Sequence, residues 1–395
     1  MKKLTVIFLA FLSLTVFGQT ETETVKKAND LIANKKYESA FNLLNNFDPE
    51  NSKPDIVLLK VDIVLNYFVS SIMHQVFALK DLEENENIMD YRGHNGKFNV
   101  HMFQVDSILG KLIEIYPINC NLYKGLGKFY YEVYLKYSEG WLKNDNELFD
   151  LIQTNFRKVV DGNCADDFSN YVLGYININQ EKYQESIPYF LKAIELNKDY
   201  ATSHYNLAYA YLFIDDRENA LKYAKNALDL YSDREYKSDA ARMLGVIYSE
   251  LEDDENAIES YETADKIDPE NYYILKSLLE LYVKTDNKKA DETTNVFFNL
   301  DPTNPTIYND LGKIYDNYDK ENKLIVFYKS QISAFKDNKN VLGNLNFSLG
   351  RIYIEMDKKT AKEYFLKSKK IFEGVFDKNH QVFNVIEEGL KKCEN

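Results

Sequence analysis

The residues best suited to bind a metal ion lie close together in the amino-terminal half of the chain. Asp90, His94, His101 and Asp106 carry carboxylate and imidazole groups, which commonly bind zinc. Their spacing matches no compact ligand motif such as His-Glu-x-x-His, and dedicated metal loops place their ligands closer together. We therefore predict no metal site.

A neighbouring segment with two glycines, Arg92–Lys97, superficially suggests a loop that cradles phosphate. Its glycine spacing differs from that of a phosphate loop, Phe98 stands where Ser or Thr is needed, and we expect no strand before it. We interpret the segment as a turn between helices. No serine or cysteine lies in a recognisable nucleophile motif either, so we predict no catalytic residues and no cofactor.

The three cysteines are too few for a disulfide scaffold. Cys120 and Cys164 each follow an asparagine, at or just before the start of a predicted helix, so an exported protein could join them. Neighbouring helices lie about 8 to 10 Å apart, which is farther than a disulfide reaches between Cα atoms unless a loop dips inward. A Cys120–Cys164 disulfide is therefore possible, but the sequence leaves it open.

The first residues are typical of an export signal. Lys2 and Lys3 precede an apolar run from Leu4 to Phe17, which is too short to span a bilayer comfortably. Gly18 suits a cleavage site, so we place the mature start at Gln19, with an uncleaved anchor as the alternative. No later segment approaches membrane-span length. We expect a periplasmic or secreted protein with no membrane span after cleavage.

The chain is acidic, with 62 Asp and Glu against 48 Lys and Arg and a formal charge of −14. Loss of the signal and its two lysines would make the charge more negative still. An acidic balance opposes non-specific attraction to the phosphates of nucleic acids and to anionic lipids, so we expect neither as a partner. The 15 glycines and 7 prolines leave little room for a long flexible linker.

A Leu-Gly-x-x-Tyr pattern recurs along the chain and indicates its architecture. The clearest copies begin at Leu126, Leu244, Leu311 and Leu349. From Gly174 onward, the position that holds the small residue recurs after 34, 37, 34, 33 and 38 residues. A period in the thirties predicts stacked helical hairpins instead of a globular catalytic core.

The best copy, Ser238 to Asn271, resembles the tetratricopeptide repeat. Its residues at the family's characteristic positions are Leu244, Gly245, Tyr248, Ala257, Tyr261, Ala264 and Pro269. We expect the small residues to lie where the two helices cross, the tyrosines to fill the gaps beside the crossing, and the proline to end the second helix. The resemblance implies an all-α fold, a right-handed superhelical solenoid of helix-turn-helix repeats.

The resemblance divides the chain into a signal peptide (1–18), divergent repeats with insertions (19–166), six repeats (167–376) and a capping helix (377–395). The six units are 167–200, 201–237, 238–271, 272–304, 305–342 and 343–376. In the divergent part, we expect a long apolar stretch, Asp55 to Leu82, to pair with Phe98 to Tyr116. Extra residues around Trp141 lengthen a later hairpin.

The position of the later tyrosine in each motif is predicted to be structural. Six tyrosines share it, and we expect all of them in the core: Tyr130, Tyr211, Tyr248, Tyr282, Tyr315 and Tyr353.

The resemblance also implies where a ligand would bind. In this family, positions 2, 5, 9, 12 and 13 of each first helix line a concave groove. Two units place aromatic residues at those positions: Phe168, Tyr171, Tyr175, Tyr205, Tyr209 and Phe213. Later units place basic residues there: Arg242, Lys276, Lys313 and Arg351. The aromatic rings could grip a peptide or a sugar and the basic residues could pair with carboxylates; alternatively, the rings pack on neighbouring units and the charges are simply solvated.

The family's carboxylate-binding clamp of lysine and asparagine is not reproduced, because tyrosines occupy the corresponding places. Two functions remain compatible with the sequence. The first is a non-catalytic, exported scaffold that binds a partner protein or an extended peptide in the groove. The alternative is a protein that captures carbohydrate on an aromatic surface. The missing lipid-anchor cysteine and the single tryptophan count against this alternative.

Overall fold

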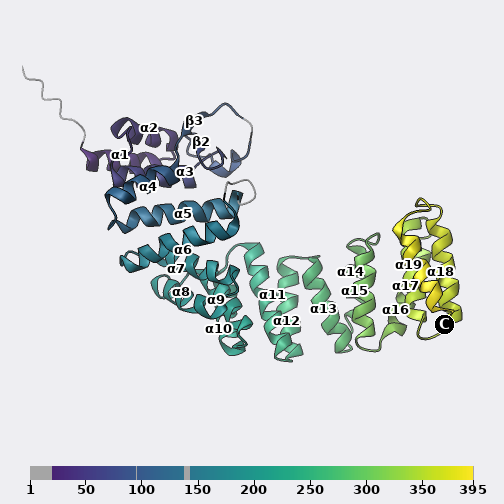
Figure 1. The fold of residues 1–395 in the computed structure, drawn as a ribbon. Coiled ribbons are helices and arrows are strands. Elements are labelled where there is room, and N and C mark those ends of the chain that lie inside the picture. Colours follow the sequence, from purple (N-terminus) through teal and green to yellow (C-terminus); the bar gives the residue numbers. More distant parts are fainter. Residues whose placement is uncertain (1–19, 95, 138–142, 395) are drawn as a thin grey trace, which may run out of the picture. The chain divides into compact units, whose positions relative to one another are not determined.

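The structure is a computed structural model that describes residues 20–94, 96–137 and 143–394 (Figure 1). The predicted signal peptide and Trp141 lie outside these residues. The chain forms two compact units, residues 1–198 and 199–395. Antiparallel helices joined by short turns dominate both units, as the predicted all-α repeat fold requires.

The first unit contains eight described helices and a small sheet. The helices are α1 (Glu21–Ala33), α2 (Tyr37–Phe47), α3 (Pro54–Asn66), α4 (Val105–Ile115), α5 (Cys120–Tyr137), α6 (Asp145–Asp161), α7 (Asp167–Asn179) and α8 (Tyr183–Leu196). Between α3 and α4 lie strands β1 (Ser70–Ile72), β2 (Val76–Leu79) and β3 (Asn99–Met102), with a 3₁₀ turn, η1 (Ile88–Asp90), in the connection.

The second unit contains the remaining helices, which are again arranged in hairpins. They are α9 (Ala201–Phe213), α10 (Arg217–Leu230), α11 (Arg234–Glu250), α12 (Asp254–Ile267), α13 (Tyr272–Lys284), α14 (Ala290–Asn299), α15 (Pro305–Asp316), α16 (Glu321–Ala334), α17 (Lys339–Tyr353), α18 (Lys358–Phe372) and α19 (Gln381–Lys392). Helix α19 contacts α17 and α18, and its Ile386 and Leu390 are buried.

The sheet corrects our expectation for the divergent part of the chain. The stretch Asp55 to Leu82 is helical only as far as Asn66, and β3 precedes the helix expected in Phe98 to Tyr116. In β2 the successive residues Phe77, Ala78 and Leu79 are all buried, so burial does not alternate along the strand. Without alternation, a short strand is not distinguished by its period from the end of an apolar helix.

The turns inside the hairpins share one backbone conformation. Glu181, Asp215, Glu252, Asp286 and Asp319 each adopt a left-handed conformation, with φ between 53° and 68°. After each of them the next amide closes the first helix; for example, the Asp253 amide donates to the Tyr248 carbonyl at 3.0 Å. This is the usual left-handed end of a helix, here without glycine.

Close contact between a glycine and an aromatic ring holds the best hairpins together. A Cβ added to Gly245 would lie 2.7 to 2.8 Å from the ring of Tyr261, and one added to Gly174 would lie 2.7 to 2.9 Å from that of Phe190. The rings therefore lie in the helix crossing itself and not in gaps beside it. At Gly312, by contrast, an added Cβ would meet nothing within 4 Å, so the motif glycine there makes no such contact.

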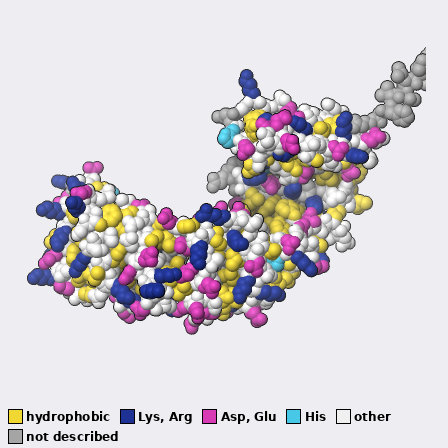
Figure 2. Space-filling model, turned by 180° about the vertical axis from the view of Figure 1, so that it is seen from behind, with side chains coloured by type: hydrophobic (Ala, Val, Ile, Leu, Met, Phe, Trp, Pro, Cys, Tyr) yellow, Lys and Arg dark blue, Asp and Glu magenta, His cyan; other side chains and the backbone are white. Residues whose placement is uncertain are grey.

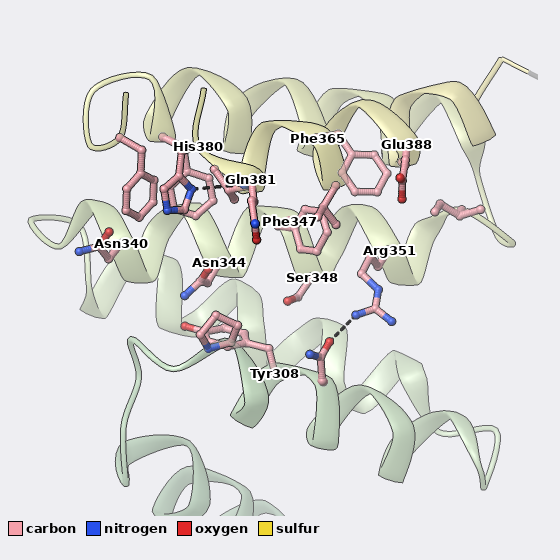
Figure 3. Close-up of a pocket in the computed structure, with 18 of the residues that line it drawn as sticks. Tyr308, Asn340, Asn344, Phe347, Ser348, Arg351, Phe365, His380, Gln381 and Glu388 are labelled. Carbon is pink, nitrogen blue, oxygen red and sulfur yellow. Dashed lines mark hydrogen bonds between the residues drawn. The ribbon is translucent and has the colours of Figure 1, made fainter. Parts of the chain in front are cut away.

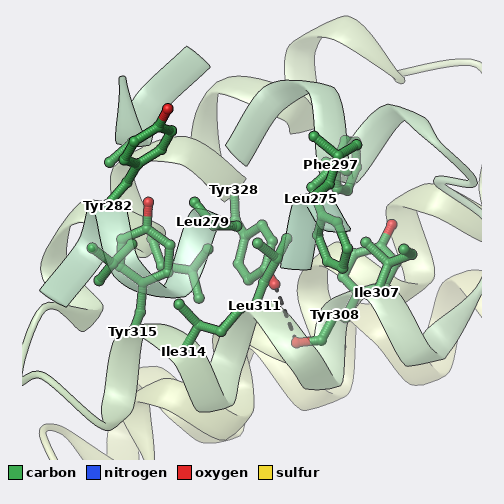
Figure 4. Packing of buried hydrophobic residues seen from close by; sticks show 14 of the residues in the cluster. Leu275, Leu279, Tyr282, Phe297, Ile307, Tyr308, Leu311, Ile314, Tyr315 and Tyr328 are labelled. Atoms are coloured by element: carbon green, nitrogen blue, oxygen red, sulfur yellow. Dashed lines mark hydrogen bonds between the residues drawn. The ribbon is translucent and has the colours of Figure 1, made fainter. Parts of the chain in front are cut away.

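Larger side chains replace the glycine contact in helices α13 to α17 (Figure 4). Leu324 stands where the repeat pattern has alanine, and it is fully buried together with Tyr328. Polar ends of the buried rings are satisfied: the Tyr328 hydroxyl donates to the Tyr308 carbonyl at 3.4 Å, and Tyr315 shares a 2.7 Å hydrogen bond with Thr294. These hairpins thus keep a continuous core with a different set of contacts.

The six motif tyrosines do not all lie in the core. Tyr130, Tyr282 and Tyr315 are buried, whereas the other three are only partly buried. Tyr211 stacks on Tyr223 with ring centroids 5.7 Å apart, and Tyr353 stacks on Tyr364 at the same distance. The expectation was wrong for Tyr211, Tyr353 and Tyr248, because their rings are only partly covered.

Cys120 and Cys164 form a disulfide, with Cα atoms 6.4 Å apart. Cys120 begins α5, and Cys164 lies in the loop after α6, where Asn163 has a φ of 55°. That turn brings the loop inward, since a Cβ added to Gly162 would lie 2.8 Å from the Cβ of Cys120. The inward dip is the condition under which a disulfide can join the start of α5 to the loop after α6 and so close the α5–α6 hairpin.

The contrast between Gly245 and Gly312 can be tested by one substitution in each. We expect Gly245→Ala to lower the free energy of unfolding by about 1 to 3 kcal/mol, because the Tyr261 ring must move. Gly312→Ala should leave it unchanged or raise it by about 0.5 to 1 kcal/mol, since alanine favours the helix. Thermal melts followed by circular dichroism measure both, and equal shifts for the two variants would contradict the role of the ring contact.

Candidate ligand grooves on the first helices

A cavity of about 510 Å³ lies between the first helices of two successive repeats, α9 and α11. We call it the tyrosine groove. It is lined by Tyr205, Tyr209, Leu212, Phe213, Asp215, Arg217, Arg242, Met243, Val246 and Glu250. The residues at positions 5, 9, 12 and 13 of the first of these repeats all lie in it, because residues three or four apart share one face of a helix.

The aromatic residues of this groove differ in their exposure. Tyr205 lies edge-on to Tyr231, with ring centroids 6.3 Å apart, and burial raises the pKa of its hydroxyl to about 12. The rings of Tyr209 and Phe213 are 4.6 Å apart, and Phe213 is 52% exposed. Tyr205 therefore forms part of the floor, whereas Phe213 presents its ring at the open side.

Charged pairs surround the aromatic floor. Arg242 lies 3.3 Å from Asp239, and Arg217 lies 2.9 Å from Glu250. On the face seen in Figure 2, Lys and Arg side chains are interspersed with Asp and Glu. The tyrosine groove is therefore an apolar surface with charges of both signs nearby, not a site for one sign of charge.

The other three predicted aromatic residues belong to the first unit and pack there. Tyr171 is only 8% exposed and lies against Phe190, so it is a core residue, and our expectation that it lines a groove is wrong. Phe168 and Tyr175 both lie edge-on to Tyr131, at 5.8 and 6.0 Å. These contacts are made because the first helices of neighbouring repeats approach closely enough for large rings to meet.

The predicted basic residues do not form one row. Lys276 donates to Asp310 at 2.8 Å, and the Tyr272 hydroxyl also donates to that carboxylate. Lys313 is exposed, and Arg351 donates to the Asn309 side chain. Each of these basic residues therefore has different neighbours, because successive first helices place the same repeat position beside different side chains.

A second cavity, of about 830 Å³, lies between α15, α17 and α19 (Figure 3). We call it the C-terminal cavity. Helix α17 contributes its groove positions to the lining: Asn344, Phe347, Arg351, Ile354 and Glu355. Helix α19 contributes the opposite wall, with His380, Gln381, Val385, Glu388 and Lys392.

Hydrogen bonds orient the polar side chains of the C-terminal cavity. The Asn344 side-chain amide donates to the Thr303 carbonyl at 3.1 Å. His380 caps α19 by accepting from the Val382 amide at 3.2 Å, and its ring stacks on Phe376 with centroids 4.1 Å apart. Polar groups in fixed positions beside aromatic and aliphatic side chains are typical of a ligand site.

Sequence reasoning found Arg351 and missed the rest of this cavity. The repeat register could have identified Asn309, Asn344 and Phe347, which occupy the same groove positions as the residues predicted from the sequence. The wall formed by α19 carries no repeat signal, so only packing of that helix on α17 and α18 reveals it.

The described residues contain no group of three or more His, Cys, Asp or Glu placed to hold a metal ion. Within the same residues, none of the helices is both long and apolar enough to cross a bilayer. The region around the segment Arg92–Lys97 is a turn beside η1, as far as it is described.

The stacked helical hairpins place the chain among the helical-repeat solenoid proteins. A family model described as a tetratricopeptide repeat matches residues 169–200, 201–234 and 243–271. Residues 169–271 therefore contain tetratricopeptide repeats, as the motif resemblance indicated for this part of the chain. No curated protein sequence matches it.

Several solved structures are similar to parts of the chain. A tetratricopeptide repeat protein from Parabacteroides merdae is 17% identical and matches over 69% of this chain and 99% of its own, with a TM-score of 0.42. The MamA protein is 20% identical over 46% of this chain and 91% of its own, with a TM-score of 0.39. YrrB, described as having an unusual peptide-binding site, is 17% identical over 47% of this chain and 95% of its own, with a TM-score of 0.37.

The floor and the open side of the tyrosine groove should respond differently to truncation. We expect Tyr205→Ala to lower the free energy of unfolding by about 2 to 3 kcal/mol, because it removes a ring packed against the core. Phe213→Ala should cost about 1 kcal/mol or less, since about half of its side chain is already exposed to solvent. Thermal melts of both variants test this, and a larger loss for Phe213→Ala would place that ring in the core.

Proposed function

We propose that this protein is a non-catalytic interaction scaffold, exported from the cell, that binds an extended segment of a partner protein on its first helices. The tyrosine groove carries the proposal. Groove positions of two successive repeats, occupied by Tyr209, Phe213, Arg242 and Val246, converge on one open cavity. Half-exposed aromatic side chains beside charges of both signs suit the alternating apolar and polar groups of a peptide.

The C-terminal cavity supports the same function at a second place in the unit. Asparagine side chains both donate and accept hydrogen bonds, so Asn309 and Asn344 match the donors and acceptors of a peptide backbone. Phe347 and Val385 supply apolar surface beside them. The cavity would recognise a bound partner segment through the segment's backbone and one or two of its apolar side chains.

Export is supported by the amino-terminal sequence together with the disulfide between Cys120 and Cys164. Disulfides persist in oxidising compartments and are rare in the cytosol. We therefore place the mature protein in the periplasm or outside the cell.

Mass spectrometry of the protein isolated from its native host tests the export proposal. After alkylation without reduction, we expect a chain that begins at Gln19, with a label on Cys393 alone and a peptide pair joined through Cys120 and Cys164. Retention of Met1 together with three alkylated cysteines would contradict export.

Site-specific crosslinking tests the groove. A photoreactive phenylalanine analogue at Phe213 should capture a partner protein in an envelope extract, whereas the same analogue at Leu366 should not. Leu366 is a matched control because it is 48% exposed, close to the value for Phe213, and lies on the second helix α18. A synthetic peptide of the captured segment should then bind the wild type about tenfold more tightly than Phe213→Ala, which corresponds to loss of one aromatic contact.

Two results would count against this function. Equal capture at both positions would mean that the groove is not selective. Binding to a glycan array that Phe213→Ala abolishes, without any captured protein, would favour the carbohydrate-binding alternative.

A further inference from the structure

The small sheet in the first unit has an open edge. The strand order is β1-β2-β3, so β3 pairs with β2 on one side only among the described residues. The other edge is partly covered where β1 begins, because the Gly93 amide donates to the Val69 carbonyl at 3.1 Å and the Arg92 side chain donates to the Phe68 carbonyl at 3.3 Å. β3 is therefore the accessible edge of the sheet.

The hydrogen-bond pattern shows which backbone groups of β3 point outward. The Phe103 amide donates to the Gln75 carbonyl at 2.8 Å, and the register continues with His101 opposite Phe77. Bonded and non-bonded pairs alternate in an antiparallel ladder. The amide and carbonyl groups of Val100 and Met102 consequently point away from β2, toward solvent.

Apart from Ser70, the side chains on the outer face of the sheet are apolar. Ile72, Val76 and Met102 form one row across the three strands, and Val100 lies beside them on the same face. Val100 is 66% and Met102 78% exposed. Natural proteins usually protect an edge strand with charged residues, proline or a covering segment, and β3 has none of these.

The size of the face argues against a second copy of the chain as its occupant. Three strands of about four residues each cover roughly 200 Å², from the spacing and rise of β-strands. A stable interface needs about 800 Å² from each partner. An added strand, in contrast, gains backbone hydrogen bonds as well as side-chain contacts, so a short edge is enough.

The charge at one end of β3 indicates where a charged residue of the added strand would lie. A small cavity of about 240 Å³ beside Asn99 is lined by Lys80, Lys97 and Glu38, among others. Lys80 lies 3.6 Å from Glu86, and Glu38 is partly buried and accepts from the neutral Asn99 side chain, whereas Lys97 is exposed. An acidic residue would complement it.

We propose that the outer edge of β3 binds an extended segment of a partner protein that has alternating apolar residues and an acidic residue beside Lys97. The segment pairs with the outward amide and carbonyl groups of Val100 and Met102. Its apolar side chains extend the row formed by Ile72, Val76 and Met102. This surface is separate from the grooves of residues 199–395 and does not depend on the function proposed for them.

Hydrogen exchange with residue resolution tests the proposal on the full mature chain. The probe is a soluble decapeptide of alternating valine and threonine with glutamate at one end. We expect about tenfold slower exchange at the Val100 and Met102 amides at saturating peptide, since local protection follows the bound fraction. The His101 amide, already bonded to β2, should change little.

Variants of both partners provide controls. Val100→Pro removes an outward amide and should weaken binding about tenfold, whereas Ile72→Thr, on the same face but away from the edge, should change it less than about threefold. If Val100→Pro does not fold, Met102→Lys serves instead, because it introduces a charge at the edge. On the peptide side, N-methylation of the residues that face β3 should abolish binding.

Three outcomes would overturn the proposal. The first is saturation by the peptide without slower exchange at Val100 and Met102. The second is equal binding of a peptide with the same composition but with its valines grouped together. The third is self-association of the chain that Val100→Pro abolishes, which would assign the edge to a second copy.

Discussion

The hairpins α7–α8 and α11–α12 each depend on an aromatic ring that lies against a glycine of the facing helix. At Gly174 and Gly245 the ring occupies the space that a Cβ would need, so the two helices can approach only at that point. This contact aligns the first helix, and the alignment decides which of its residues face the groove. In α9 the buried Ala208 takes the place of the glycine, and Tyr205, Tyr209 and Phe213 lie in one cavity because residues three or four apart share one face of the helix.

The middle of the second unit shows that the fold tolerates loss of this contact when volume is conserved elsewhere. At Gly312 an added Cβ would meet no atom within 4 Å, and Tyr315 of α15 and Leu324 and Tyr328 of α16 are buried in the core instead. Hydrophobic cores accept such exchanges if the total volume is kept. The first helices α15 and α17 still run side by side, and with α19 they enclose the C-terminal cavity.

The first unit adds two features that a plain repeat does not have. A disulfide closes the open end of the α5–α6 hairpin, and a three-stranded sheet interrupts the helices between α3 and α4. The helical grooves offer side chains to a ligand, whereas the β3 edge offers backbone groups. The two kinds of surface therefore suit different parts of partner proteins: grooves discriminate by side-chain shape and charge, and a strand edge mainly by extended conformation.

The sequence by itself determined the repeat architecture, because the spacing of small and aromatic residues reports directly on helix crossings. It also identified Tyr205, Tyr209 and Phe213 on one face of α9 and Arg242 on α11, which line the same cavity. Tertiary structure decided the rest. Burial of Tyr171, the ion pair of Lys276 and the wall formed by α19 depend on neighbours that no repeat position specifies. The sheet and the disulfide depend on how loops turn, since short strands inside an apolar run and a cysteine in a loop have no distinctive period.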